Sequence, residues 1–306
     1  DIDSDVDDAG TLAMLYTLHK QHKINLLGTI VTSDDPFAAT CVSAFNAFYG
    51  MGQLPLGFLE GQSSLKNHSR YTRQISEEFP HDLASWRDAE AATHTYRKLL
   101  AESPDHSVVI LTIGHLSSLQ KLLQSSADQY SPLNGKQLVE AKVRKWYCMG
   151  GLFPEGKEAN FSRPDPASTV YCLANWTKDV VFCGWEIGQQ VVSGDAALKA
   201  KLPREHPMYR AYELYNNFQG RASWDQVTAF LLSDEASRYF ELDNAGSCQL
   251  QADGSNRWIP GPKRNQSIVR FKPGVNVQEV AGQITKLMLG KDIPVNSYIP
   301  WKGKSV

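Results

Sequence analysis

Residues 1–15 read DIDSDVDDAGTLAML, and this stretch decides how the rest of the chain is interpreted. It places five aspartates within eight positions, directly before a helix-like apolar run. Carboxylates this close repel one another unless a cation or solvent compensates. Their hard oxygens suit Ca²⁺ or Mg²⁺, although aspartates at a helix N-terminus also serve as simple caps. The stretch therefore predicts an acidic metal site, with Asp5 alone facing solvent or the loop.

Two other metal or phosphate motifs resemble this stretch. An EF-hand loop needs glycine at its sixth position and glutamate at its twelfth, where this chain has Val6 and Leu12, so that motif is excluded. An aspartyl phosphatase would use Asp1 as the nucleophile and Asp3 as the acid. That mechanism does not explain the Asp7-Asp8 pair that runs into the helix, but it stays open as an alternative.

The position of the cluster raises a question about the start of the fold. Aspartates of this kind normally follow a strand, and here they begin the sequence. We expect residues 1–306 to form a single domain whose first strand is truncated or lies upstream of residue 1. A signal peptide upstream would imply a periplasmic or secreted protein, and without one the protein would be cytoplasmic, so the compartment stays open.

The bulk composition narrows the class of protein. The 306 residues are 42% hydrophobic and 21% charged, which is ordinary for a globular protein. A net charge of −2 gives no field that would favour nucleic acid or a membrane surface. The five cysteines are scattered, without metal-type pairing, and are expected to be mostly reduced. Neither nucleic acid nor a membrane surface is therefore expected as a partner.

Short apolar runs alternate with helical patterns along the chain. Strands are expected at 26–31, 108–113, 145–149 and 180–183, and helices at 36–49, 116–123 and 166–174. This rhythm predicts an α/β fold with a mostly parallel central sheet flanked by helices, a Rossmann-like open sheet. Ligands bind such sheets beyond the carboxyl ends of the strands, where 33–35, 114–115 and 149–151 lie.

Other segments show weaker patterns. The polar stretch 60–88 is interpreted as a long loop or lid, and 249–267 as a small β excursion. Helices are expected at 207–217 and 224–232, on either side of a turn at 219–221. An amphipathic helix at 275–289 follows them.

The pattern Asp-x-Asp-x-x-x-Asp-Asp-Ala entering a helix resembles the signature of inosine-uridine-type nucleoside hydrolases. Further segments fall in that family's order: 112–119, 149–151, 158–160 with 165–166 behind it, and 224–225. The resemblance spans residues 1 to about 232 and places the chain in a divergent branch. It implies a nucleoside-hydrolase-like fold and calcium-dependent hydrolysis of a ribonucleoside or related ribosyl compound, as in nucleoside salvage.

The resemblance also implies roles for individual residues. Calcium would be held by Asp3, Asp8, Asp225 and the carbonyl of Ile113, with Asp1 standing behind these ligands. Asp7 and Asn160 would bind ribose hydroxyls, Glu158 the 5′ end of the sugar, and Met149 would line the substrate pocket. Catalysis would fall to Asp3, Asp7 and Asn160. The metal would lower the pKa of a bound water whose proton Asp3 takes, and the carboxylates would stabilise positive charge on the sugar.

Each role has a plainer alternative. Asn160 suits an Asx turn, Glu158 a solvated loop charge, and Asp225 the first turn of a helix.

Three departures from the family pattern affect the residues expected to contact the sugar and the leaving group. Residues 32–35 replace a Gly-Asn pair, so Asp34 is the candidate sugar contact while Asp35 suits a helix cap. Trp224 stands where the family has a proton-donating histidine, and an indole can only stack or pack there. His115 is another possible donor or a structural residue. Glu186, beside Trp185 at a strand end, either faces the ligand or is a loop charge.

Because of these departures, two functions from different classes remain possible interpretations of the sequence. One is calcium-dependent N-glycoside hydrolysis, and the other is a catalytically silent calcium-dependent sugar- or nucleoside-binding protein. The resemblance also implies a homodimer or homotetramer.

Overall fold

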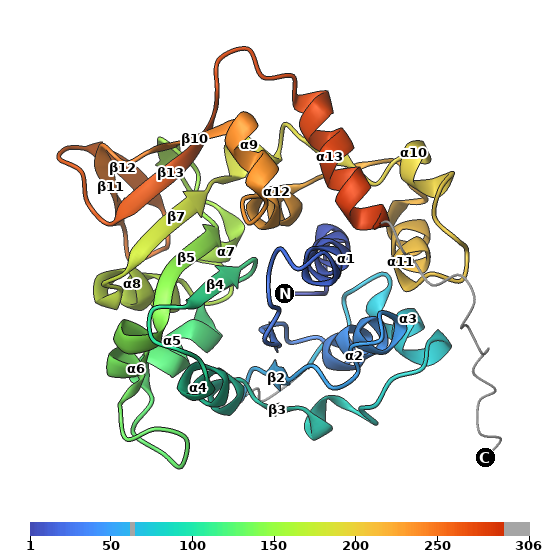
Figure 1. The fold of residues 1–306 in the computed structure, drawn as a ribbon, viewed down its shortest axis with the longest axis horizontal. Coiled ribbons are helices and arrows are strands. Elements are labelled where there is room, and N and C mark those ends of the chain that lie inside the picture. Colours follow the sequence, from blue (N-terminus) through green and yellow to red (C-terminus); the bar gives the residue numbers. More distant parts are fainter. Residues whose placement is uncertain (62–64, 291–306) are drawn as a thin grey trace.

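The computed structural model describes residues 1–61 and 65–290, and its largest sheet has five strands, which lie on the left of the view in Figure 1 beside the N-terminal helix. Its order is β10-β13-β7-β5-β4. Four strands run parallel, and only β10 is antiparallel to its neighbour. The strands are β4 (Val108–Thr112), β5 (Val143–Met149), β7 (Asp179–Cys183), β10 (Phe240–Asp243) and β13 (Gln266–Phe271). The prediction of a mostly parallel central sheet is confirmed.

Alternate residues of the central strands enter two separate cores. In β7, Val181 and Cys183 pack into one hydrophobic cluster, while Val180 and Phe182 pack into the other. The first core lies among α1 (Asp7–Lys20), α2 (Ala38–Phe48), α11 (Pro207–Asn216), α12 (Trp224–Phe230) and α13 (Val277–Leu289). The second lies among α4 (Ala92–Glu102), α5 (Ser117–Gln124), α6 (Gly135–Lys142) and α8 (Pro166–Asn175). A sheet with period-two side chains is thus covered on both faces.

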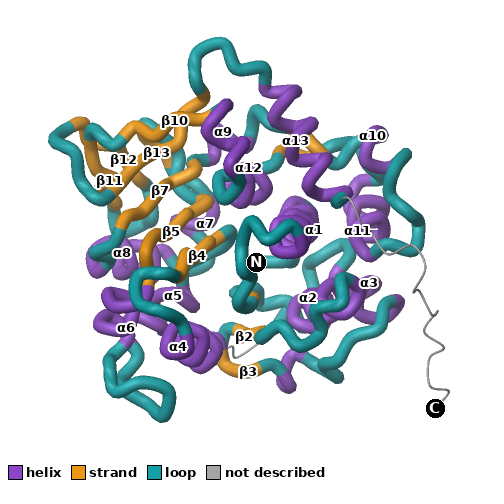
Figure 2. Tube along the Cα trace, in the orientation of Figure 1, coloured by secondary structure: helices purple, strands orange, loops and turns teal. Residues whose placement is uncertain are grey.

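A second parallel sheet stands beside β4. It contains β1 (Thr29–Val31), β2 (Leu56–Phe58) and β3 (Glu90–Ala91). The loop of residues 1–6 lies between the two groups of strands and leads into α1 (Figure 2). Residues 7–18 of α1 are all buried, so this helix runs through the core instead of along the surface.

Two expectations from the sequence are wrong in part. The strand predicted at 26–31 forms only at Thr29–Val31, and residues 26–30 are half-buried instead of buried on both faces. The cause is local, because one edge of β1 borders a cavity and not another strand. The segment 60–88 is not simply a loop: it contains α3 (Thr72–Glu78) and the short helix η1 (Trp86–Asp88).

Other predicted elements are present, and they stand among short elements that the sequence patterns did not indicate. The β excursion is the antiparallel pair β11 (Gly246–Leu250) and β12 (Asn256–Pro260), which β6 (Glu155–Gly156) joins. The turn at 219–221 is centred on Gly220, whose φ is +80°. Short elements complete the chain: α7 (Ala159–Ser162), α9 (Trp185–Gly188), β8 (Val192–Ser193), α10 (Ala196–Lys199), β9 (Arg221–Ala222) and η2 (Asp234–Arg238). Within the described residues, no helix has both the length and the apolar character to cross a bilayer.

Candidate active site

Three buried carboxylates converge where the N-termini of α1 and α12 meet. Asp7 and Asp8 open α1, and Asp225 lies in the first turn of α12. One oxygen from each of the three lies within 4.8 Å of the others. The Asp225 main-chain N–H donates to Asp7 Oδ2 at 3.1 Å, across 218 residues of sequence. Two helix N-termini thus aim their positive ends at one group of anions.

This group has the electrostatics of a site that needs a cation. Burial, followed by repulsion from neighbouring aspartates, holds the pKa of Asp7 and of Asp225 well above the usual range. Burial likewise raises the pKa of Asp8 to about 7. The main-chain nitrogen of Asp1 is 3.4 Å from Asp8 Oδ1, but without hydrogen-bonding geometry, so this buried oxygen has no hydrogen-bond partner among the described residues. A divalent cation fits because it would bind this oxygen and offset the repulsion.

Asp3 belongs to a second group of side chains. Its Oδ2 accepts a hydrogen bond from Ser33 Oγ at 2.6 Å and lies 3.5 Å from His68 Nε2. His68 Nε2 is also 3.6 Å from Asp34 Oδ1. The structure brings Asp3, Asp34 and His68 together, so the meeting of Asp3 with Asp8 and Asp225 at one cation stays a prediction.

The predicted carbonyl ligand and Asp1 lie just beyond β4. Asp1 packs so closely on Gly114 that a Cβ there would stand 2.7 Å from Asp1 Oδ1, and only glycine leaves this space. Ile113, Asp1 and Asp8 all border a cavity of about 710 Å³ between β1 and β4. Asp7 and Asp225 do not line that cavity, so the carboxylates, and not the cavity, define the candidate site.

Glu158 organises the main chain around the end of β5. Its Oε1 accepts from Asn160 N–H at 2.7 Å, and its Oε2 accepts from the N–H groups of Gly151 and Phe161 at 3.0 and 3.2 Å. Burial nevertheless raises the pKa of this carboxyl. Glu158 is therefore a buried helix cap and not a solvated loop charge, and its contact with the sugar stays a prediction. Asn160 donates from Nδ2 to the carbonyl oxygen and sulfur of Met149, which fixes its amide at the strand end.

Two tryptophans form an aromatic rim next to Asp225. Trp224 and Trp185 stack with ring centroids 6.3 Å apart and an interplanar angle of 28°. Trp224 Nε1 donates to the Trp185 carbonyl at 3.1 Å, so the indole N–H is already engaged within the protein. The Arg221 guanidinium lies 4.7 Å from the Trp224 ring and donates from Nε to Asp5 Oδ1 at 2.8 Å. Asp5 is thus separate from the group of Asp7, Asp8 and Asp225, as expected, but it forms an ion pair with Arg221 instead of facing solvent.

Three further candidates make hydrogen bonds within the protein. Both ring nitrogens of His115 are engaged, by the Thr32 carbonyl at 2.6 Å and Ser117 Oγ at 3.0 Å, and burial lowers its pKa. Glu186 accepts from Phe153 N–H at 2.9 Å, and burial raises its pKa. Asp35 is buried and accepts from Phe37, Asn67 and Thr72. Asp35 thus organises the turn before α2, while Asp34 reaches His68.

Reasoning from the sequence missed three residues of the site, which are His68, Arg221 and Ser33. His68 lies in a stretch without periodicity, so nothing in the pattern tied it to Asp3 and Asp34. Arg221 was part of an expected turn, and only the fold shows that it reaches Asp5. Ser33 was visible as a strand-end hydroxyl, which is a signal that could have been used.

Comparisons with known proteins bear on the fold. No family model matches the sequence, and no curated protein matches it. Among solved structures, the chain is similar to an inosine-uridine preferring nucleoside hydrolase from Bacillus anthracis, with 16% identity, a TM-score of 0.69, and 94% of this chain and 97% of that one covered. It is also similar to a plant nucleoside hydrolase, with 17% identity, a TM-score of 0.66, and 95% and 98% covered.

A third similar structure is the type III effector protein XopQ complexed with adenosine diphosphate ribose, with 13% identity, a TM-score of 0.61, and 94% and 90% covered. The chain therefore has the fold of the nucleoside hydrolases over almost its whole length. The resemblance expected from the aspartate signature is confirmed at the level of the fold.

Proposed function

We propose, from the nucleoside-hydrolase fold of this chain and its buried carboxylates, that it is a divergent calcium-dependent hydrolase of that family. Its substrate would be a ribonucleoside or related ribosyl compound, cleaved at the N-glycosidic bond to ribose and a free base. The observation that carries the proposal is the convergence of Asp7, Asp8 and Asp225, together with the buried Asp8 Oδ1, which accepts no hydrogen bond from the described residues. Asp8 and Asp225 would hold the cation, with Asp3 and the Ile113 carbonyl nearby.

Calcium would supply a Lewis acid that activates water and chelates the vicinal hydroxyls of a ribose. The residues of the chain supply the rest. Asp3 suits a base: burial raises its pKa, but the Ser33 hydrogen bond and nearby positive charge outweigh burial, and the net effect is a lowered pKa that keeps it ionised. Asp7 and Asn160 would orient the sugar hydroxyls. The surrounding carboxylates would stabilise the positive charge that develops on the ring.

The leaving-group side would be the aromatic rim of Trp185 and Trp224. A flat ring can stack there, but the indole N–H of Trp224 is already bonded to a carbonyl and is far too weak an acid to protonate a purine. His115 is also engaged on both ring nitrogens. We therefore propose that the enzyme favours leaving groups that depart with little or no protonation.

The same rim supports a second candidate function. A protein that binds a ribosyl ligand through calcium, without turning it over, needs the carboxylates but not a proton donor. The similarity to an effector protein complexed with adenosine diphosphate ribose adds that compound to the ligands worth testing. An aspartyl phosphatase is disfavoured, because that mechanism gives no role to Asp225 in the buried group.

The deciding experiment measures base release and calcium binding in parallel. Ribonucleosides, deoxyribonucleosides and p-nitrophenyl riboside, whose leaving group needs no protonation, are incubated with calcium or with excess chelator. Adenosine diphosphate ribose is added as a binding ligand in calorimetry. The variant is Asp225→Asn, and the matched control is Asp5→Asn, whose carboxylate belongs to the same sequence cluster but pairs with Arg221.

We expect calcium-dependent release from p-nitrophenyl riboside and from a subset of ribonucleosides, lost in Asp225→Asn and kept in Asp5→Asn. Calcium-dependent ligand binding with no release from any compound would establish the silent binding protein. Release that is insensitive to chelator, or a failure to bind calcium at all, would refute both functions.

A further inference from the structure

His115 joins the end of β4 to the loop that follows β1. It lies between β4 and α5, and its Nε2 is 2.6 Å from the main-chain carbonyl oxygen of Thr32, 83 residues away in the sequence. A carbonyl oxygen can only accept, so this contact requires a proton on Nε2, which the imidazolium and one neutral tautomer of the ring both provide. His115 is buried, so little water competes for the bond.

The imidazole ring is held from its other side as well. Ser117 Oγ, in the first turn of α5, lies 3.0 Å from His115 Nδ1 and donates to Asp165 Oδ2 at 2.9 Å. Asp165 is fixed in turn as the N-cap of α8, where its Oδ1 accepts from the Ser168 N–H at 3.2 Å. The orientation of the ring is therefore set by contacts from the starts of two helices.

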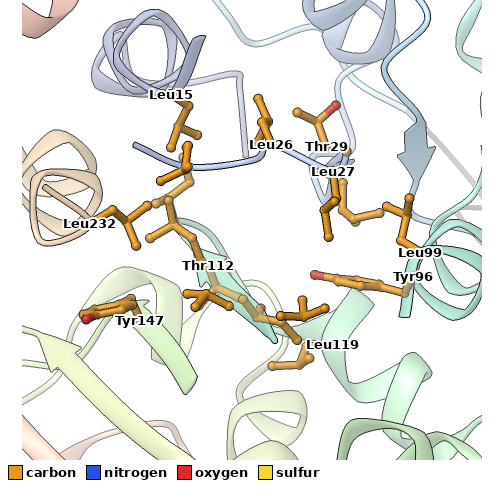
Figure 3. A pocket seen from close by; sticks show the side chains of 18 of the residues that line it. Leu15, Leu26, Leu27, Thr29, Tyr96, Leu99, Thr112, Leu119, Tyr147 and Leu232 are labelled. Atoms are coloured by element: carbon orange, nitrogen blue, oxygen red, sulfur yellow. The ribbon is translucent and has the colours of Figure 1, made fainter. Parts of the chain in front are cut away.

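The bond from His115 to Thr32 crosses a space that the two parallel sheets leave open. Within residues 1–61 and 65–290, no backbone hydrogen bond joins β1 to β4. Apolar side chains such as Leu27 and Leu119 line the cavity between them (Figure 3). The bond is thus a polar tie between the loop after β1 and the strand end of the central sheet.

The peptide unit that His115 contacts also carries Ser33. A peptide unit is planar, so a bond that fixes the Thr32 carbonyl fixes the backbone nitrogen of Ser33 as well. Ser33 Oγ donates to Asp3 Oδ2 at 2.6 Å and accepts from the Asp35 N–H at 2.9 Å. The orientation of the Asp3 carboxylate therefore depends on where the loop holds the Ser33 hydroxyl.

We propose that His115 is a positioning residue for Asp3. The starts of α5 and α8 hold the ring, the ring holds the peptide unit of Thr32 and Ser33, and the Ser33 hydroxyl orients the carboxylate. The proposal rests on the proposed function, which makes Asp3 the base and a calcium ligand. Displacing a reacting group by about 1 Å can cost about 100-fold in rate, so the orientation of a base has a direct effect on turnover.

The test begins with two substitutions of His115. His115→Phe keeps an aromatic ring but removes the donor to Thr32, whereas His115→Gln keeps an amide N–H that can reach the same carbonyl. Ser117→Ala removes the support of the ring. Its matched control is Ser118→Ala, because Ser118 is fully buried and its hydroxyl has no hydrogen-bond partner among the described residues. The rate constants kcat and KM are measured with p-nitrophenyl riboside in calcium, together with the unfolding temperature.

We expect kcat to fall roughly 10-fold or more in His115→Phe and about 3-fold in Ser117→Ala, with KM changed less than about 2-fold. His115→Gln should recover most of the rate, and Ser118→Ala should match the wild type. Equal rates in Ser117→Ala and Ser118→Ala would overturn the proposal. If the unfolding temperature shows that His115→Phe does not fold, the comparison of these two serine variants decides.

A double variant tests whether His115 acts through Ser33. Ser33→Ala removes the hydroxyl that orients Asp3, so adding His115→Phe to it should cost no further rate. Additive losses of kcat would mean that His115 supports the site by another route, and the proposal would fail.

Hydrogen exchange at the Asp35 amide separates this proposal from the proposed function. The amide donates to Ser33 Oγ, so its protection reports the place of that hydroxyl without calcium or turnover. It should exchange faster in His115→Phe and Ser117→Ala than in the wild type and Ser118→Ala. A wild type that releases no base would refute the hydrolase and leave this comparison valid, whereas equal protection in all four forms would refute the positioning role in an active enzyme too.

Discussion

The carboxylate group and the aromatic rim lie side by side, yet they are built in opposite ways. Asp7, Asp8 and Asp225 are buried at two helix N-termini and tied together by a main-chain hydrogen bond. Trp185 is 39% exposed, and Trp224 sits on a rim whose partners are a short helix and an arginine. A position fixed from all sides tolerates few residue types, whereas an exposed rim accepts many. The comparison suggests that the fold fixes the carboxylates of the proposed metal site, while the aromatic rim is free to diverge.

Among substitutions in the carboxylate group, Asp8→Asn should have the largest effect. The amide cannot replace a carboxylate at a cation, so we expect calcium binding to be lost and kcat/KM to fall by roughly 10³-fold. In chelator, however, the variant should be at least as stable as the wild type, because it removes a buried carboxylate that repels its neighbours. Thermal unfolding with and without calcium checks this, and a variant that unfolds in both buffers would mean that Asp8 has a structural role.

The next prediction concerns the pH dependence of stability, which the buried carboxylates should set and the aromatic rim should not. Burial raises the pKa of Asp7 and Asp225, and that of Asp8 to about 7, so the folded state holds protons that the unfolded state releases above about pH 4. Without calcium, stability should therefore fall as pH rises from about 4 through the neutral range, because the folded state then loses protons that the unfolded state has already released. Calcium should abolish this fall. Chemical denaturation at a series of pH values, in chelator and in calcium, measures it, and a flat profile in chelator would contradict the burial of unpaired carboxylates.

A substitution in the aromatic rim should have a smaller effect, and it should change KM instead of calcium binding. Trp185→Ala removes half of the stack, and we expect KM to rise about 10-fold for substrates with aromatic leaving groups, in keeping with the value of a stacking contact. Ribose release from substrates with small leaving groups should change little. The calcium-dependent rise in unfolding temperature should stay as in the wild type. An equal loss for every substrate would show that Trp185 supports the fold and not the leaving group.

The sequence predicted some parts of the fold and of the candidate site better than others. Strands β4, β5 and β7 and helices α2, α5, α8 and α13 were predicted because their periodicity depends on burial, whereas β2, β10, α4 and α6 were not. The aspartates indicated a metal site because carboxylates crowded into eight positions repel one another unless a cation or solvent compensates, and that site stays a prediction. Glu158 was harder, since glutamate is an unusual helix cap and its three main-chain donors come together only in the fold. His68 could not be assigned at all, because its approach to Asp3 depends on how residues 65–71 lie against the loop that follows β1.

Arg221 contacts both Trp224 of the aromatic rim and Asp5 of the aspartate cluster, and its substitution should have the smallest effect. It is about one-third exposed, so Arg221→Met should cost no more than about 1 kcal/mol of stability. Its positive charge nevertheless lowers the pKa of Asp7, after the larger effects of burial and of the neighbouring aspartates. Removing it leaves Asp5 uncompensated and makes the site more negative, so calcium affinity should rise about 2-fold, while Asp5→Asn should lower it by a similar factor. Calorimetric titration of both variants measures these changes. Opposite shifts would show that Arg221 and Asp5 act on the cation only through charge, and a loss of affinity in Arg221→Met would mean that the rim helps to hold the carboxylates in place.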